Sequence, residues 1–309
     1  MWFALVALIF LALIKLVYIK AFKKAFVRGP FLRFGNKSLL ADNKNEYWDE
    51  LKEKGRLWRE AQNAKEVKIT SHDNLTLVAS LYENPAKKGV FLLFHGYRSN
   101  TIKDFDCILE KYYNLGYSLL VPDQRAHGRS EGKYITYGIL ERFDCKKWIE
   151  FVKELYGKNV PIYLDGLSMG ATTVLMAAGL NIEANIRGII SDSAFSSPVQ
   201  IIEKVGHDDL KLPKWLFLPQ IKLLCRMIAH FDLDATTTYE ALKNTDLPIL
   251  FIHGTADELV PYEMAKKHCS LENNKRELVS IEGATHAFGY IVNTSLVESK
   301  LFAFIKRTS

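Results

Sequence analysis

Short apolar runs alternate with helix-favouring stretches along most of this chain. From residue 66 onward, runs of four to six apolar residues are predicted strands, at residues 89–94, 118–121, 160–164, 186–191, 248–252 and 277–281. Helical patterns such as residues 139–155 lie between them. Alternation of this kind predicts an α/β fold with a mostly parallel sheet covered by helices on both faces.

Three stretches depart from this alternation. Residues 67–70 and 75–82 flank a turn signal at residues 72–74, which predicts an antiparallel hairpin. Residues 45–61 carry an apolar stripe at helical spacing, and we expect this helix to pack on the main body, with a position on the membrane as the alternative. Residues 196–245 lack a strand pattern and predict a helical cap over one end of the sheet. The apolar residues of this cap are expected either to line a pocket beneath it or to pack the cap onto the core.

The N-terminal segment is strongly apolar. Residues 2–14 are unbroken apolar sequence, and after Lys15 the pattern continues to residue 19. About 18 helical residues cover roughly 27 Å, close to a bilayer core. Positive charge follows the run rather than preceding it, and no small-residue cleavage site follows. Residues 1–28 are therefore predicted to form an N-terminal membrane helix that acts as an uncleaved anchor, with an interfacial helix or a cleaved signal as alternatives.

The expected organisation is an anchor at residues 1–28, an amphipathic connecting segment at 29–65 and the main α/β domain at 66–309 with its cap at about 196–245. Because the flanking lysines and arginines all follow the apolar run, the main domain is expected on the cytoplasmic side of the cell membrane.

Composition and charge argue against nucleic-acid binding and against metal binding by cysteine. The chain has 309 residues and a net charge of +6, and residues 1–40 hold seven basic and no acidic side chains, leaving −1 for the rest. The basicity belongs to the N-terminus rather than to a nucleic-acid-binding face. The four cysteines, Cys107, Cys145, Cys225 and Cys269, form no metal-ligand spacing and are expected to be small buried hydrophobes.

One motif indicates catalysis. Residues 166–170 read Gly-Leu-Ser-Met-Gly, a G-x-S-x-G pattern between a predicted strand and a predicted helix. Glycine at 166 and 170 would relieve crowding in the tight turn, which holds the Ser168 hydroxyl above the strand ends. A serine hydroxyl needs a base, and that base needs an orienting acid.

The order along the chain selects the partners. His286 is the expected base, because it alone among the later histidines lies in a loop after the last predicted strand. Asp257 follows the preceding strand and is the expected acid, with Asp192 as the alternative. His253 is expected to pack its loop, and His268 to be solvated in a helical stretch rich in lysine. His207 and His230 fall in the predicted cap.

Two backbone N–H groups must hold the developing oxyanion. One is expected from Met169, the residue after the nucleophile, and the other from Tyr97, in the loop after the strand at 89–94.

These motifs together resemble the α/β-hydrolase superfamily, in the branch of serine aminopeptidase-like and monoglyceride-lipase-like enzymes. The resemblance covers residues 66–306 and includes the His-Gly loop at His95, the D-x-R-x-x-G-x-S run from Asp123 to Ser130, and the G-x-x-D at residues 254–257. It implies that Asp123, Arg125 and Ser130 brace loops near the site.

The sequence thus predicts a membrane-anchored serine hydrolase that cleaves carboxylic esters through an acyl-enzyme, with acyl or lipid esters among its candidate substrates. This chemistry needs no cofactor or metal. A peptidase, amidase, thioesterase or acyltransferase would use the same triad, and a membrane-tethered binding protein without activity is the alternative of a different class.

Overall fold

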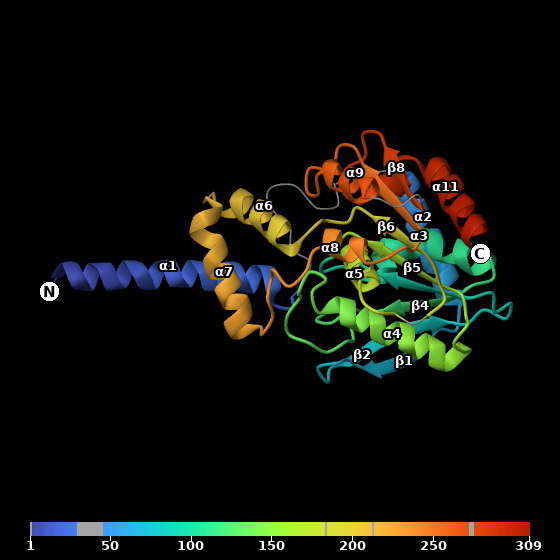
Figure 1. The fold of residues 1–309 in the computed structure, drawn as a ribbon, viewed down its shortest axis with the longest axis horizontal. Helices are drawn as coiled ribbons and strands as arrows, with labels where there is room; N and C mark the ends of the chain where they lie inside the picture. The colour runs from blue at the N-terminus through green and yellow to red at the C-terminus, as the bar shows by residue number, and fades with distance from the viewer. Residues whose placement is uncertain (1, 30–45, 183, 212, 272–274) are drawn as a thin grey trace.

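A computed structural model describes residues 2–29, 46–182, 184–211, 213–271 and 275–309 (Figure 1). Within them an eight-stranded sheet runs in the order β1-β2-β4-β3-β5-β6-β7-β8. The strands are β1 (Lys65–Thr70), β2 (Thr76–Tyr82), β3 (Val90–Phe94), β4 (Ser118–Pro122), β5 (Ile162–Leu167), β6 (Ile186–Asp192), β7 (Ile249–Gly254) and β8 (Arg276–Ile281).

The sheet confirms the predicted α/β fold. β2 pairs antiparallel with β1 and β4, and all later neighbours are parallel. The hairpin of β1 and β2 matches its turn signal. β7 extends two residues beyond its predicted end at Ile252, through His253 and Gly254. Because parallel strands end at one edge, the loops after β3, β5, β6, β7 and β8 share one end of the sheet.

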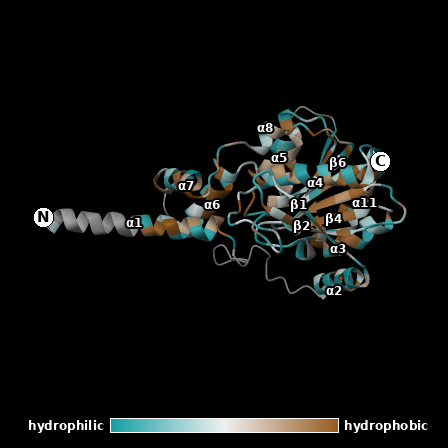
Figure 2. Cartoon of the chain, turned by 90° about the horizontal axis from the view of Figure 1, so that it is seen from below, coloured by the Kyte–Doolittle hydropathy of each residue, from teal (hydrophilic) through white to brown (hydrophobic). Residues whose placement is uncertain are grey.

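Helices cover both faces of the sheet. α3 (Thr101–Asn114) and α11 (Thr294–Thr308) pack on one face, where Leu109, Leu301 and Phe304 are buried. α4 (Glu141–Tyr156), α5 (Met169–Ala178) and α8 (Thr238–Lys243) cover the other. α9 (Tyr262–Ser270) and α10 (Gly289–Val292) follow β7 and β8. In Figure 2 helices such as α4 show both hydrophilic and hydrophobic residues. This layering places the core on the two faces of the sheet, so the loops at the ends of the strands can carry functional residues.

α2 (Glu46–Ala61) packs against α3, in keeping with its apolar stripe. The Trp58 ring lies against Tyr113, with ring centroids 5.5 Å apart. Arg59 Nε lies 3.2 Å from Asp106 Oδ1. A Cβ at Gly55 would come within 2.2 Å of the Asp106 carbonyl oxygen, so a glycine allows the two helices to approach.

The predicted cap is only partly a separate element. Between β6 and β7 the chain forms α6 (Pro198–Leu210) and α7 (Lys214–Ile228), beside the carboxyl end of the sheet (Figure 1). α8, which also falls within residues 196–245, contacts α5 instead and belongs to the main body. Residues 30–45 of the predicted connecting segment, Met1 of the predicted anchor and residue 212 of the cap lie outside the described residues.

The N-terminal segment forms α1 (Trp2–Phe26), which projects away from the sheet and passes beside α7 (Figure 1). Among the described residues no helix combines the length and the apolar character that crossing a membrane requires, so the predicted transmembrane helix is not supported.

The C-terminal half of α1 packs against the main body of the protein. Phe26 is fully buried, and its ring contacts those of Phe22, Tyr137 and Phe231 at centroid distances of 5.2, 5.4 and 5.9 Å. Tyr18 is also buried, and its hydroxyl donates to the Leu216 carbonyl of α7. We call this contact between α1 and its neighbours the α1 seam. Residues that the sequence assigned to an anchor therefore belong to the core.

Candidate active site

Ser168 lies in a strained turn between β5 and α5. Its φ of 55° and ψ of −112° are unfavourable for a residue with a side chain. A Cβ on Gly170 would come within 1.8 Å of the Phe94 carbonyl oxygen, and one on Gly166 within 2.4 Å of Gly170. Only glycine fits at these two positions, so the turn that the motif predicted forms as expected.

The structure brings Ser168, His286 and Asp257 together. His286 Nε2 lies 2.8 Å from Ser168 Oγ, and His286 Nδ1 lies 2.7 Å from Asp257 Oδ2. The three side chains come from the loops after β5, β8 and β7. A histidine that donates from Nδ1 to a carboxylate keeps Nε2 as an acceptor for a serine proton.

Asp257 is held as a carboxylate. Its Oδ1 accepts the amides of Leu259 and Val260 at 2.9 and 2.8 Å. Burial alone would raise the pKa of Asp257, but His286, His253 and the Val260 amide outweigh burial and hold the pKa well below its usual range. The acid therefore stays ionised and can stabilise a charged imidazole.

Asp192, the alternative acid, lies at the end of β6 beneath the nucleophile. Its carboxylate accepts the Ser193 hydroxyl at 2.8 Å, and its backbone carbonyl accepts the Ser168 amide at 2.7 Å. Burial raises the pKa of Asp192 to about 6. In the described residues the bond to His286 comes from Asp257, which leaves Asp192 in a supporting position.

Two histidines differ from their predicted surroundings. His253 does more than pack a loop, because its Nε2 lies 2.9 Å from the Val260 carbonyl and 3.3 Å from Asp257 Oδ2. The solvated position predicted for His268 is wrong: this α9 side chain is fully buried, and its Nε2 lies 2.6 Å from Thr238 Oγ1 of α8. Lysines on the other faces of α9 hid this burial. His207 and His230 are exposed.

The loop after β3 lies beside the nucleophile. Gly96 and Tyr97 line the same cavity as Ser168 and His286, and Met169 begins α5 directly after the serine. Asp104 braces this loop, since its carboxylate accepts the Gly96 amide at 2.7 Å and the Ser99 hydroxyl at 2.6 Å. The sequence analysis missed Asp104, although an acidic residue in the first turn after a Ser-Asn cap is a recognisable signal.

The C-terminal end of α1 is bound to this same loop. The Tyr97 hydroxyl donates to the Ala25 carbonyl at 2.8 Å, and the Tyr137 hydroxyl donates to the same carbonyl at 3.0 Å. Arg98 Nη2 donates to the carbonyls of Lys24 and Val27 at 2.8 and 2.6 Å. Tyr97 and Arg98 of the loop after β3, together with Tyr137, thus satisfy carbonyls that the helix end leaves unpaired.

The segment after β4 supports the loop from the other side. The Arg98 amide donates to His127 Nε2 at 2.9 Å, and the Gln124 amide donates to His95 Nε2 at 3.1 Å. Ser130 Oγ donates to the Asp123 carbonyl at 2.5 Å. Burial lowers the pKa of both histidines to about 4, so each remains a neutral acceptor near neutral pH.

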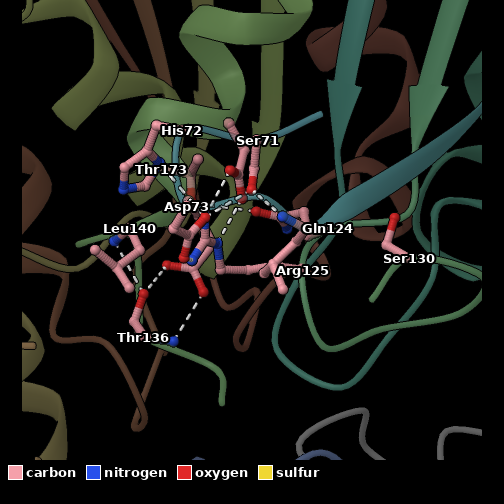
Figure 3. A network of polar contacts seen from close by, with 12 residues as sticks. Ser71, His72, Asp73, Gln124, Arg125, Ser130, Thr136, Leu140 and Thr173 are labelled. Carbon is pink, nitrogen blue, oxygen red and sulfur yellow. Dashed lines mark hydrogen bonds and ion pairs between the residues drawn. The ribbon is translucent and has the colours of Figure 1, made fainter. Parts of the chain in front are cut away.

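Arg125 fixes that segment to the hairpin (Figure 3). Its guanidinium donates to Asp144 at 2.6 and 2.7 Å and to Asp73 at 2.9 and 3.0 Å. These bonds agree with the bracing role that the resemblance implied for Arg125. Ligand atoms of His72, Asp73 and Asp144 lie within 4.8 Å of one another, as in a cation site. Arg125 already supplies the positive charge there, so these residues do not fit a metal.

A cavity of roughly 70 Å³ opens beside Ser168. Its wall is mainly apolar and comes from the loops and from α6; the contributing side chains include Tyr137, Leu167, Phe195, Ile201, Ile202 and Val205. Part of the predicted cap therefore lines a pocket at the site, which was one of the two expectations for its apolar residues. A larger hollow of about 1230 Å³ lies at the opposite edge, at the starts of β6, β7 and β8, away from the triad.

Comparisons with known proteins agree with this fold. The family model for the alpha/beta hydrolase fold matches residues 89–217. YqkD of Bacillus subtilis, a protein of uncharacterised function, is 25% identical over 65% of this chain and 66% of its own length. A monoglyceride lipase homolog of Monkeypox virus is 23% identical over 64% of this chain and 82% of its own.

Among solved structures, the esterase Pf2001 of Pyrococcus furiosus superimposes with a TM-score of 0.64 and 25% identity, covering 81% of this chain and 95% of that one. The chain spans between about half and two thirds of the length of the first curated relatives that it matches.

The fold, the family model and the similar esterase structure together support placing the chain in the α/β-hydrolase superfamily.

Proposed function

We propose that this chain hydrolyses carboxylic esters through Ser168, His286 and Asp257. The observation that carries the proposal is the continuous contact from Ser168 Oγ to His286 Nε2 and from His286 Nδ1 to Asp257, at 2.8 and 2.7 Å. The esterase Pf2001 among the similar structures favours an ester over other acyl groups.

In the proposed reaction, Ser168 Oγ attacks the acyl carbonyl carbon while His286 Nε2 takes its proton. The amides of Tyr97 and Met169 stabilise the oxyanion of the tetrahedral intermediate. His286 then donates the proton to the leaving alcohol, and the acyl group stays on Ser168. Water repeats the attack with His286 as base, and the carboxylic acid leaves.

The cavity beside Ser168 favours a short apolar acyl group. A volume of roughly 70 Å³ is about two water volumes, and its walls are mainly apolar. We expect acetate and butyrate esters to react faster than decanoate esters when all are presented in solution.

The first test is labelling of the full chain with a fluorophosphonate probe. Labelling should vanish in Ser168→Ala and fall steeply in His286→Ala, while Ser280→Ala, an exposed serine on β8, should label normally. Equal labelling of Ser168→Ala and wild type would contradict the proposal. Matched thioester and amide substrates then separate thioesterase and peptidase activity from ester hydrolysis.

The cellular location is proposed from the sequence alone. We propose that the apolar N-terminal segment holds the chain at the cell membrane with the hydrolase on the cytoplasmic side. Cell fractionation tests the first part. Labelling of Cys107 or Cys269, both partly exposed, by an impermeant thiol reagent in whole cells would contradict the second.

A further inference from the structure

Helix α7 carries apolar side chains on two opposite faces. Phe217, Ile221 and Cys225 point inward and are buried with the α1 seam. On the other side Trp215, Pro219, Leu223 and Met227 recur every four residues, and we call them the outer face. Trp215 is 72% exposed, Leu223 49% and Met227 67%. Residues four apart share a side of a helix, so the outer face is one continuous stripe.

Exposed apolar residues concentrate in this part of the molecule. Of twelve large apolar side chains exposed in the described residues, eight lie on α1 or α7. α1 meets α7 where the Tyr18 hydroxyl donates to the Leu216 carbonyl, and the neighbouring Leu16 and Val17 are 52% and 46% exposed. Clustering of this kind marks an interaction surface, whereas single exposed apolar residues do not.

The charge around the outer face selects its partner. Residues 15–28 and 211–228 hold nine basic side chains and no acidic one. Acidic neighbours pair with Lys214, Lys222 and Arg226 of α7, but Lys15 and Lys20 of α1 are exposed and add positive charge. A second copy would bring like charges together. An anionic lipid surface offers both apolar depth and negative charge, which suits a helix with tryptophan and lysine at its surface.

We propose that the outer face of α7 docks on an anionic lipid surface. Docking there would place the α6–α7 cap, and with it the apolar cavity beside Ser168, at the lipid interface. This contact is additional to any binding by the apolar start of α1, and it does not require hydrolysis. Binding can therefore be measured in Ser168→Ala, so its failure is distinct from failure of the proposed function.

The test is co-flotation of the full chain with vesicles of phosphatidylcholine, with and without phosphatidylglycerol. The double variant Trp215→Ser with Met227→Ser should bind anionic vesicles at least about tenfold more weakly. Its matched control, Leu57→Ser with Leu155→Ser, removes exposed apolar side chains from α2 and α4. The control should bind within about twofold of the unsubstituted chain.

Two further readouts separate α7 from α1. Subtracting the fluorescence emission of Trp215→Phe from that of the unsubstituted chain isolates the emission of Trp215. This emission should shift to shorter wavelength on anionic vesicles, because Trp215 leaves water. Lys15→Gln with Lys20→Gln should lower the affinity for anionic vesicles by about fivefold per charge and leave phosphatidylcholine binding unchanged. Unchanged vesicle binding by Trp215→Ser with Met227→Ser, together with unchanged Trp215 emission, would overturn the proposal. Self-association of the chain that Trp215→Ser with Met227→Ser abolishes would assign the outer face to a second copy instead.

Discussion

The triad and the α1 seam are neighbours, but different forces hold them. At the triad, polar side chains from separate loops meet through hydrogen bonds of 2.7 to 2.9 Å, with Asp257 fully buried. At the seam, aromatic rings such as those of Phe22 and Phe26 pack without polar partners. The first region depends on exact positions and accepts buried charge, whereas the second stabilises the structure through buried apolar area.

The largest effect on activity is expected from a substitution at Asp257, the acid of the triad. Asp257→Asn removes the charge that orients His286, and kcat should fall by about 10⁴-fold. Hydrolysis of a soluble acetate ester measures it. Asp192→Asn is the matched control, because Asp192 lies in the same region yet bonds to Ser193. A loss in Asp192→Asn as large as that in Asp257→Asn would show that the acid is misassigned.

The α1 seam should respond in stability rather than in chemistry. Phe26→Ala removes a fully buried ring and should lower the free energy of unfolding by about 3–5 kcal/mol. Urea denaturation measures it. Val17→Ala, on the exposed side of α1, should change the free energy by less than about 0.5 kcal/mol. Equal, small effects of both variants would mean that α1 is not packed as described.

Buried charge at the catalytic end should reduce stability in a way that depends on pH. Asp165 lies on β5, accepts the Tyr112 hydroxyl at 2.7 Å, and burial raises its pKa from 3.8 to about 7. The folded state therefore binds this proton more tightly than the unfolded state. Its contribution to stability is full below pH 3.8 and is lost as the pH rises toward about 7.

Asp165→Asn keeps an acceptor for Tyr112 and removes the charge. It should stabilise the fold by about 2–4 kcal/mol at pH 8, with the gain disappearing near pH 4. Parallel urea titrations of both proteins across this range measure the difference. A gain that does not vary with pH would show that Asp165 is not the titrating group.

The sequence predicted the catalytic end far better than the seam. The elbow, the order of Ser168, Asp257 and His286, and the strand pattern all depend on local rules of turn geometry and periodicity. The docking of α1 depends on contacts between residues more than one hundred positions apart, such as Phe26 with Tyr137 and Phe231. The sequence pattern of an apolar helix is the same whether lipid or protein covers it. Residues 18–26 were therefore assigned to an anchor.

Arg98 joins the two regions and gives the smallest and most specific prediction. It belongs to the loop after β3 that carries the proposed oxyanion donor Tyr97, which we call the oxyanion loop, and its guanidinium donates to the Lys24 and Val27 carbonyls at the end of α1. Arg98→Ala should let the Tyr97 amide drift and lower kcat by about tenfold, with KM changing by less than about threefold. Arg98→Lys retains a donor and should recover part of the loss.

Arg28→Ala is the matched control for Arg98→Ala. Arg28 also joins the end of α1 to the body, but it donates to the carbonyls of Ser130 and Gly128 instead of reaching from the oxyanion loop. Its loss should leave kcat within about twofold while lowering stability by about 1 kcal/mol. If Arg28→Ala and Arg98→Ala reduced kcat equally, the effect would come from general loosening of α1. A selective loss in Arg98→Ala would mean that packing at the seam sets the position of the oxyanion donor.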